Sequence, residues 1–157
     1  MPSNAPLADI KLHPAFIVIS SVALVSMLRN AWQLHFANSV AAFSKLFGAV
    51  LSVTGVIVLI FAYGAMAANQ TTIDPKKPTT TIVKGGIYRF SRNPIYIGWF
   101  LLLLGQGVVR GSVAQLLVAI VMIFLLHYAV VLKEEVYLAA AFGDDYLQYK
   151  NKVRRWI

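Results

Sequence analysis

Four apolar segments dominate this chain, and they cover residues 14–28, 46–68, 95–109 and 113–132. The segment 46–68 is long enough for a tilted membrane span. At a rise of about 1.5 Å per residue, 113–132 matches the roughly 30 Å of hydrocarbon in a bilayer. We therefore expect an all-α integral membrane protein with about four transmembrane helices.

Composition narrows the class further. The 157 residues are 59% hydrophobic and 13% charged, which leaves room for a single membrane domain, residues 1–157, and none for a soluble one. The absence of cysteine excludes disulfides, thiolate metal ligands and cysteine nucleophiles. Three scattered histidines have no metal-site spacing, so we predict no metal. The polar, non-basic start lacks a cleavage-site pattern, and we expect no signal peptide.

The basic residues predict the orientation of the spans, because lysine and arginine gather on the cytoplasmic side. With four spans, Arg29, Lys45 and Arg110 fall on one side and eleven basic residues on the other. We therefore place both termini in the cytoplasm. This asymmetry also accounts for the net charge of +8 without a nucleic-acid partner. The eleven are Lys11, Lys76, Lys77, Lys84, Arg89, Arg92, Lys133, Lys150, Lys152, Arg154 and Arg155.

The connections between the spans suggest where a site could form. The link Arg110-Gly111-Ser112 requires a tight helical hairpin, and the long loop between the second and third spans contains enough apolar residues to be ordered and functional. A helix broken near Gly143 should lie at the membrane interface. The predicted parts are two N-terminal spans in 1–68, a cytosolic cofactor loop in 69–94, a hairpin in 95–132, and a cytosolic C-terminal helix and tail in 133–157.

Residues 85–98, GGIYRFSRNPIYIG, form a polar cluster that joins directly onto the third span. Asn93 is a favoured N-cap, and Pro94 suits the first turn of a helix because that turn needs no proline N–H. The positive end of the helix dipole and the charge of Arg92 would together attract a carboxylate or phosphate. One turn further, Gly98 would let a ligand or a neighbouring helix approach the backbone.

A second polar cluster, residues 133–150, follows the last span and begins with Glu134 and Glu135. Acidic groups at a helix C-terminus oppose the helix dipole, although this penalty vanishes if the helix continues through residue 142. Ionisable groups so close to hydrocarbon are functional candidates. His127, inside the fourth span, could be a hydrogen-bonded bundle histidine or a pocket residue.

Two motifs in these clusters resemble the isoprenylcysteine carboxyl methyltransferase family and the related phospholipid N-methyltransferases. The resemblance covers roughly residues 80–155. The first motif is Gly86-x-Tyr88-x-x-x-Arg92-Asn93-Pro94-x-Tyr96-x-Gly98, and the second is Glu134-Glu135-x-x-Leu138-x-x-x-Phe142-Gly143-x-x-Tyr146-x-x-Tyr149.

The resemblance implies a membrane methyltransferase that uses S-adenosylmethionine without a Rossmann domain. Its cofactor would lie on the cytosolic side, and a lipid substrate would enter laterally from the bilayer. Arg92, Glu134 and Glu135 would be catalytic, and Leu138, Phe142 and Tyr146 would pack or close the lid. The cofactor-binding residues carried over by position are Tyr88, Arg92, Asn93, Pro94, Tyr96, Gly98, Glu134, Glu135, Leu138 and Tyr146.

One departure affects the expected substrate. Many eukaryotic carboxyl methyltransferases of the family have Arg-His-Pro where this chain has Arg92-Asn93-Pro94, and asparagine cannot carry charge. We favour methylation of the carboxylate of a prenylated cysteine or a similar lipid acid, with phosphatidylethanolamine N-methylation as the alternative. A sterol-type reductase using a reduced nicotinamide and a non-catalytic bundle stay open. The single compact chain suggests a prokaryotic plasma membrane and leaves the oligomeric state open.

Overall fold

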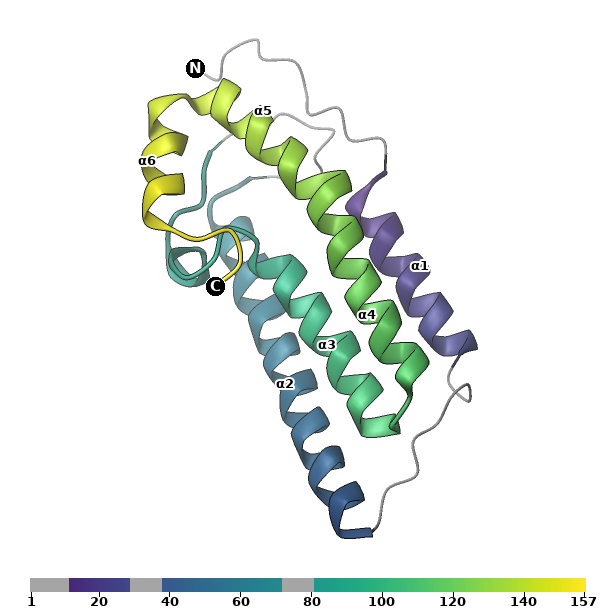
Figure 1. Cartoon of the computed structure of the whole chain (residues 1–157). Helices are drawn as coiled ribbons and strands as arrows, with labels where there is room; N and C mark the ends of the chain where they lie inside the picture. Colours follow the sequence, from purple (N-terminus) through teal and green to yellow (C-terminus); the bar gives the residue numbers. More distant parts are fainter. Residues whose placement is uncertain (1–11, 29–37, 72–80) are drawn as a thin grey trace.

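A computed structural model describes residues 12–28, 38–71 and 81–157, with the side chains of 38–40 excepted. These residues form helices, as the predicted all-α class requires (Figure 1). The predicted cofactor loop 69–94 lies partly outside the described residues. The elements are α1 (Pro14–Met27), α2 (Asn38–Ala68), η1 (Gly86–Arg89), α3 (Pro94–Arg110), α4 (Val113–Leu126), η2 (His127–Val131), α5 (Leu132–Phe142) and α6 (Asp144–Lys152).

Two helical stretches are long and apolar enough to cross a membrane, Ala41–Ala68 and Val113–Phe142, whereas α1 and α3 are shorter apolar helices. The first begins before the predicted boundary at residue 46, because exposed Lys45 continues the helix instead of ending it.

The second long stretch corrects the prediction that a separate helix begins at residue 133. A π-helical turn, η2, joins α4 to α5 without a break, so Glu134 and Glu135 lie inside a continuous helix (Figure 1). The unfavourable interaction with the helix dipole at a C-terminus is therefore absent. The break near Gly143 is confirmed, since α5 ends at Phe142 and Gly143 has a φ of 53°. Glycine tolerates this positive φ without strain.

α2 and α3 pack side by side through glycines that allow backbone-to-backbone contact (Figure 1). A Cβ atom on Gly48 would lie 2.7 Å from Gly105 O, and one on Gly55 would lie 2.7 Å from Gly98 O. The pairing of 48 with 105 and of 55 with 98 shows that the helices are antiparallel. Small residues are typical of closely packed helix interfaces in membranes.

α1 packs against α4 on the other side of the bundle. The buried amide of Gln115 donates from Nε2 to the carbonyl oxygen of Val25 over 3.2 Å. Gly111, with a φ of 61°, ends α3, and the Ser112 hydroxyl caps α4 by accepting from Gln115 N. A core formed by α1, α3, α4 and η2 includes Leu103, Met122 and Leu126.

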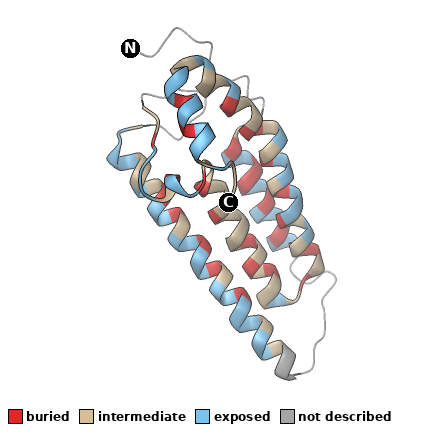
Figure 2. Ribbon diagram, turned by 60° about the vertical axis from the view of Figure 1, so that its left-hand side comes forward, coloured by how far each residue is buried: buried red, intermediate tan, exposed pale blue. Residues whose placement is uncertain are grey.

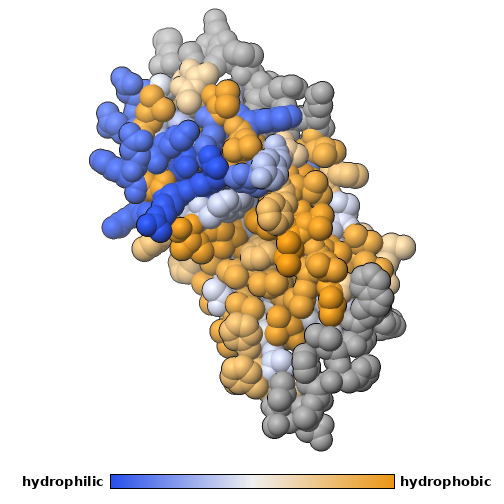
Figure 3. All heavy atoms as spheres, in the orientation of Figure 1, coloured by the Kyte–Doolittle hydropathy of each residue, from blue (hydrophilic) through white to orange (hydrophobic). Residues whose placement is uncertain are grey.

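The surface of the molecule divides into a polar end and an apolar body. Figure 3 shows hydrophilic residues gathered at the end with α6 and the C-terminus, and hydrophobic residues along the bundle. Figure 2 shows long exposed stretches on α2. Large apolar side chains in these stretches, such as Phe47, Ile60 and Phe61, are at least half exposed. Such a surface would be costly in water, and with the two long apolar helices it indicates an integral membrane protein.

Candidate functional site

The C-terminal tail after α6 folds back onto the loop before α3. The backbone N–H of Arg92 donates to Arg154 O over 3.0 Å. The carbonyl oxygen of Arg155 accepts from Ser91 Oγ at 3.2 Å and from Asn93 Nδ2 at 2.9 Å. These bonds place the guanidinium of Arg155 beside α5, and they join both ends of the motif-bearing half of the chain.

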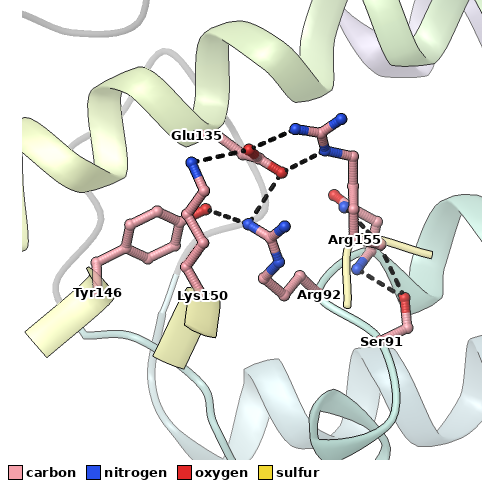
Figure 4. A network of polar contacts seen from close by, with 7 residues as sticks. Ser91, Arg92, Glu135, Tyr146, Lys150 and Arg155 are labelled. Atoms are coloured by element: carbon pink, nitrogen blue, oxygen red, sulfur yellow. Dashed lines mark hydrogen bonds and ion pairs between the residues drawn. The ribbon is translucent and has the colours of Figure 1, made fainter. Parts of the chain in front are cut away.

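Glu135 lies at the centre of an ion cluster formed by α5, α6, the loop and the tail (Figure 4). Its Oε1 is 2.7 Å from Arg155 Nε and 3.0 Å from Arg92 Nη1, and Arg155 Nη2 is 2.9 Å from Oε2. Lys150 Nζ approaches Oε2 at 3.5 Å. The side chains of Glu135 and Arg92 are 7% and 8% exposed. Three cations therefore face one buried carboxylate, which leaves an excess of positive charge.

Arg92 retains an unused donor inside this cluster. Its Nη1 also donates to Tyr146 Oη at 3.2 Å, whereas its buried Nε has no hydrogen-bond partner among the described residues. A buried donor without a partner is costly, so a ligand oxygen at this point would be stabilising.

Glu134 has different surroundings from Glu135, although the two are adjacent in sequence. Consecutive helical residues point about 100° apart, so their carboxylates occupy different sides of α5. Tyr96 Oη donates to Glu134 Oε1 over 3.2 Å. In the described part of the chain no cation pairs with Glu134. Its carboxylate is the better placed of the two to accept a hydrogen bond from a ligand.

Both acidic residues line a cavity of about 520 Å³, within the usual range for small-molecule sites. Its polar end contains Arg92, Asn93, Glu134 and Glu135. Its apolar part is formed by the first half of α1 and by residues of α2 and α3, where Trp99 Nε1 donates to Tyr63 Oη over 3.3 Å. One cavity thus joins a charged end to an apolar end.

Three tyrosines at the polar end are neutral hydrogen-bonding groups. Burial raises the pKa of Tyr88 and of Tyr149 above the usual value. Burial and then the charge of Glu135 raise the pKa of Tyr146, although Arg92 acts in the opposite direction. Tyr149 Oη donates to Tyr88 O at 2.8 Å and so fastens α6 to η1.

The structure places every predicted catalytic or cofactor-binding residue in the wall of this cavity except Gly98, and of the predicted lid residues Phe142 does not line it. Gly98 instead faces α2, where a Cβ atom would lie 2.7 Å from Leu59 Cγ. Of the two predicted partners for its close approach, the neighbouring helix is therefore the one observed. Asn93 occupies the N-cap position of α3, but its side chain makes no capping bond, and its Nδ2 donates to the tail. Pro94 is at the first helical turn, as predicted.

His127 does not line the cavity. Its ring contacts those of Tyr128 and Trp156, with centroids 4.7 and 5.9 Å away. His127 therefore lies in the bundle, as the first of the two interpretations predicts. Its buried Nδ1 has no hydrogen-bond partner within the described ranges, so the hydrogen bond that this interpretation expected is not seen at that atom.

Sequence reasoning missed Arg155 and the wall formed by α1. Arg155 lies in a short basic tail and differs in no visible way from Arg154, although only Arg155 contacts Glu135. His13, one of the three scattered histidines, also lines the cavity. Across the described residues no group of three or more histidine, aspartate or glutamate side chains could hold a metal ion.

Comparisons with known proteins agree with the motifs. The phospholipid methyltransferase family matches residues 43–145. Proteins named protein-S-isoprenylcysteine O-methyltransferase are similar to the chain. The Mus musculus protein is 29% identical over 112 residues, which are 66% of this chain and 40% of the relative. The Dictyostelium discoideum protein is 28% identical over 133 residues, 83% of this chain and 56% of the relative.

A third such protein, from Schizosaccharomyces pombe, is 35% identical over 72 residues, which are 46% of this chain and 30% of the relative. The chain thus spans between about a third and a little over half of the length of these relatives. No solved structure matches it significantly. The family match covers well over half of the chain, and it includes the first motif and most of the second. The resemblance drawn from these motifs is therefore confirmed, and the chain belongs to the phospholipid methyltransferase family.

Proposed function

We propose that this protein is an S-adenosylmethionine-dependent membrane methyltransferase that acts on a lipid. The observation that carries the proposal is the single cavity that joins the Arg92–Glu135 ion cluster to an apolar wall. A site of this kind can bind a polar cofactor at one end and a hydrocarbon chain at the other. Membership of the methyltransferase family supports the same assignment.

The charges at the polar end suit the methionine part of the cofactor, which is a zwitterion at neutral pH. The unpartnered Nε of Arg92 and the excess of positive charge around Glu135 favour a carboxylate. The carboxylate of Glu134, whose one partner among the described residues is the phenol of Tyr96, favours an ammonium group. Arg92 and Glu134 would therefore hold opposite ends of one amino-acid group, with Tyr96 orienting Glu134.

The cofactor, when bound, supplies an activated methyl group on a sulfonium. The protein then has to position the acceptor in line with that group and exclude water, and positioning of this kind can supply a large part of a rate enhancement. Arg92 is fixed by Glu135 and Tyr146, so it can orient a carboxylate without rearrangement. The tail and α6 cover the polar end, because Arg155 and Lys150 tie them to Glu135.

The preferred acceptor is the carboxylate of a prenylated cysteine or a similar lipid acid. Such an acceptor is ionised at neutral pH and needs no general base. Relatives named protein-S-isoprenylcysteine O-methyltransferase support this preference.

A phospholipid amine, as in phosphatidylethanolamine, is the second candidate, and the position of Glu134 favours it. An amine must lose a proton before it attacks, and Glu134 has no pairing cation among the described residues to oppose its acting as a base. With this acceptor Glu134 would face the lipid amine instead of the ammonium group of the cofactor, so the two roles of Glu134 are alternatives.

The proposal includes a topology. Four spans would cross the membrane with both termini and the polar end in the cytoplasm, where soluble cofactor is available. The plasma membrane of a prokaryote is the expected location. α1 and α3 are short for full spans, so their ends would lie in the headgroup region.

Transfer of labelled methyl groups tests both acceptors. Purified protein is supplied with labelled S-adenosylmethionine and either N-acetyl-S-farnesylcysteine or phosphatidylethanolamine, and Glu134→Gln is compared with Asp144→Asn. Asp144 is exposed and outside the cavity, so it controls for loss of one negative charge. If Glu134 is the base for an amine, kcat at saturating cofactor falls about 100-fold or more in Glu134→Gln. With a carboxylate acceptor, kcat is largely kept. Transfer to neither lipid by folded protein would contradict the proposed acceptors.

A further inference from the structure

α1 lies outside residues 43–145, the part of the chain that the family match covers, yet it forms one wall of the cavity. Its lining residues are Ala15, Val18, Ile19 and Val22, together with Pro14 at its start. The spacing of positions 15, 18, 19 and 22 places these side chains on one face of the helix. α1 therefore presents a continuous apolar stripe to the cavity.

A second face of α1, roughly 100° around the helix from the stripe, fixes the position of this stripe. Ile17, Ser21 and Val25 recur every four residues and are buried toward the bundle. Gln115 of α4 binds the carbonyl oxygen of Val25, so α1 can neither rotate nor slide without losing a buried hydrogen bond. The wall is therefore part of a packed helix pair.

The exposure of the stripe shows where the cavity opens. Val18 is only 6% exposed, whereas Ile19 is 66% and Val22 is 39% exposed although both line the cavity. The cavity thus opens outward along α1, at a surface of apolar side chains. A hydrocarbon chain could lie along α1 while its polar head reaches Arg92 and Glu134.

We propose that this face of α1 binds the hydrocarbon chain of the methyl acceptor and selects it by length and shape. The inference rests on the proposed function and adds a specificity-determining element to it. A chain that leaves the bilayer exchanges one apolar environment for another, so the wall contributes little transfer free energy. Discrimination must then come from fit, with added bulk on the stripe excluding longer chains.

The test compares Val22→Trp with Ala23→Trp. Ala23 is the next residue of α1, is exposed and does not line the cavity, so it controls for a new tryptophan on the helix. The substrates are N-acetyl-S-farnesylcysteine and its shorter geranyl analogue. We expect the ratio of kcat/KM for the longer over the shorter acceptor to fall about tenfold in Val22→Trp, the usual scale for steric discrimination in an apolar pocket. It should not change in Ala23→Trp. Equal ratios in all three proteins would overturn the inference.

Two further readouts keep this inference separate from the proposed function. Binding of S-adenosylhomocysteine by native protein tests the cofactor end, and Val22→Trp should bind it as the native protein does. Phosphatidylethanolamine with a diazirine in its acyl chain tests the wall without turnover. Labelling should map to residues 15–22 and decrease in Val22→Trp alone. Labelling elsewhere overturns the role of α1, whereas absent cofactor binding overturns the methyltransferase assignment.

Discussion

The contact between α2 and α3 and the polar end of the molecule are held together in opposite ways. At the first, glycines remove side chains so that two backbones can touch. At the second, charged side chains from the loop, α5, α6 and the tail converge on Glu135. The first is a rigid scaffold that aligns α3, and the second is a set of polar bonds whose partners a ligand can share. Substitutions in either region should therefore lower the stability of the protein, whereas ligand binding should fall mainly for substitutions at the polar end.

The largest effect is expected for Glu135→Gln. This change leaves Arg92 buried without its carboxylate, and breaking a buried ion pair costs about 3–5 kcal/mol. Thermal unfolding of the purified protein should show a strongly lowered Tm, and methyl transfer should be lost. Lys150→Ala is the control, because Lys150 is 40% exposed and such a pair contributes about 0–1 kcal/mol. A similar fall in Tm for both would show that Glu135 is not the centre of the cluster.

Gly105→Ala tests the scaffold. The new Cβ atom would lie 2.5 Å from Gly48 O and Ser52 Oγ, so the helices must separate, at a cost of about 1–3 kcal/mol. Gly64→Ala in α2 meets nothing within 4 Å and should keep or slightly raise the Tm. Affinity for S-adenosylhomocysteine, measured on folded Gly105→Ala, should change less than the Tm. An unchanged Tm would argue against the close contact of α2 and α3.

Asn93→Ala is expected to have a smaller effect, at the junction of loop and tail. It removes the bond from Nδ2 to Arg155 O, which contributes about 0.5–1.5 kcal/mol. Because the hydrogen bond from Arg92 N to Arg154 O remains, the tail should become more mobile but stay bound to the loop before α3. Hydrogen exchange should rise in residues 153–157 and stay constant in α3. If exchange in the tail does not change, the amide has no role in fastening it.

The smallest effect is expected for Tyr96→Phe. It removes the phenol that orients Glu134 and leaves the Glu135 cluster intact. Affinity for S-adenosylhomocysteine should fall severalfold with little change in Tm. A fall in Tm as large as that of Glu135→Gln would mean that the two carboxylates belong to one structural unit.

The polar end was the part most open to prediction from sequence. Charged residues in an apolar chain are costly unless they are used, so Arg92, Glu134 and Glu135 could be grouped before any contact was known. The glycine break at Gly143 was equally visible. The different surroundings of the two glutamates could not be predicted, because they depend on the rotation of α5 after the π-helical turn.

Other features left weak signals. Gly48 and Gly55, like Gly98 and Gly105, are seven residues apart, and this spacing could have indicated the contact between α2 and α3. Arg155 could not be distinguished from Arg154, because the direction of an arginine in a short tail is set by tertiary contacts. The role of α1 in the cavity depends on which helices pack against it, and no local sequence pattern predicts those neighbours.

Calorimetric binding of S-adenosylhomocysteine to the detergent-purified protein tests the central claim most directly. The account predicts binding by the native protein and by Asp144→Asn. It predicts at least about tenfold weaker binding by Glu134→Gln, since a hydrogen bond to a charged group contributes about 1.5–3 kcal/mol. No binding at millimolar ligand by folded native protein, or equal binding by Glu134→Gln, would contradict it.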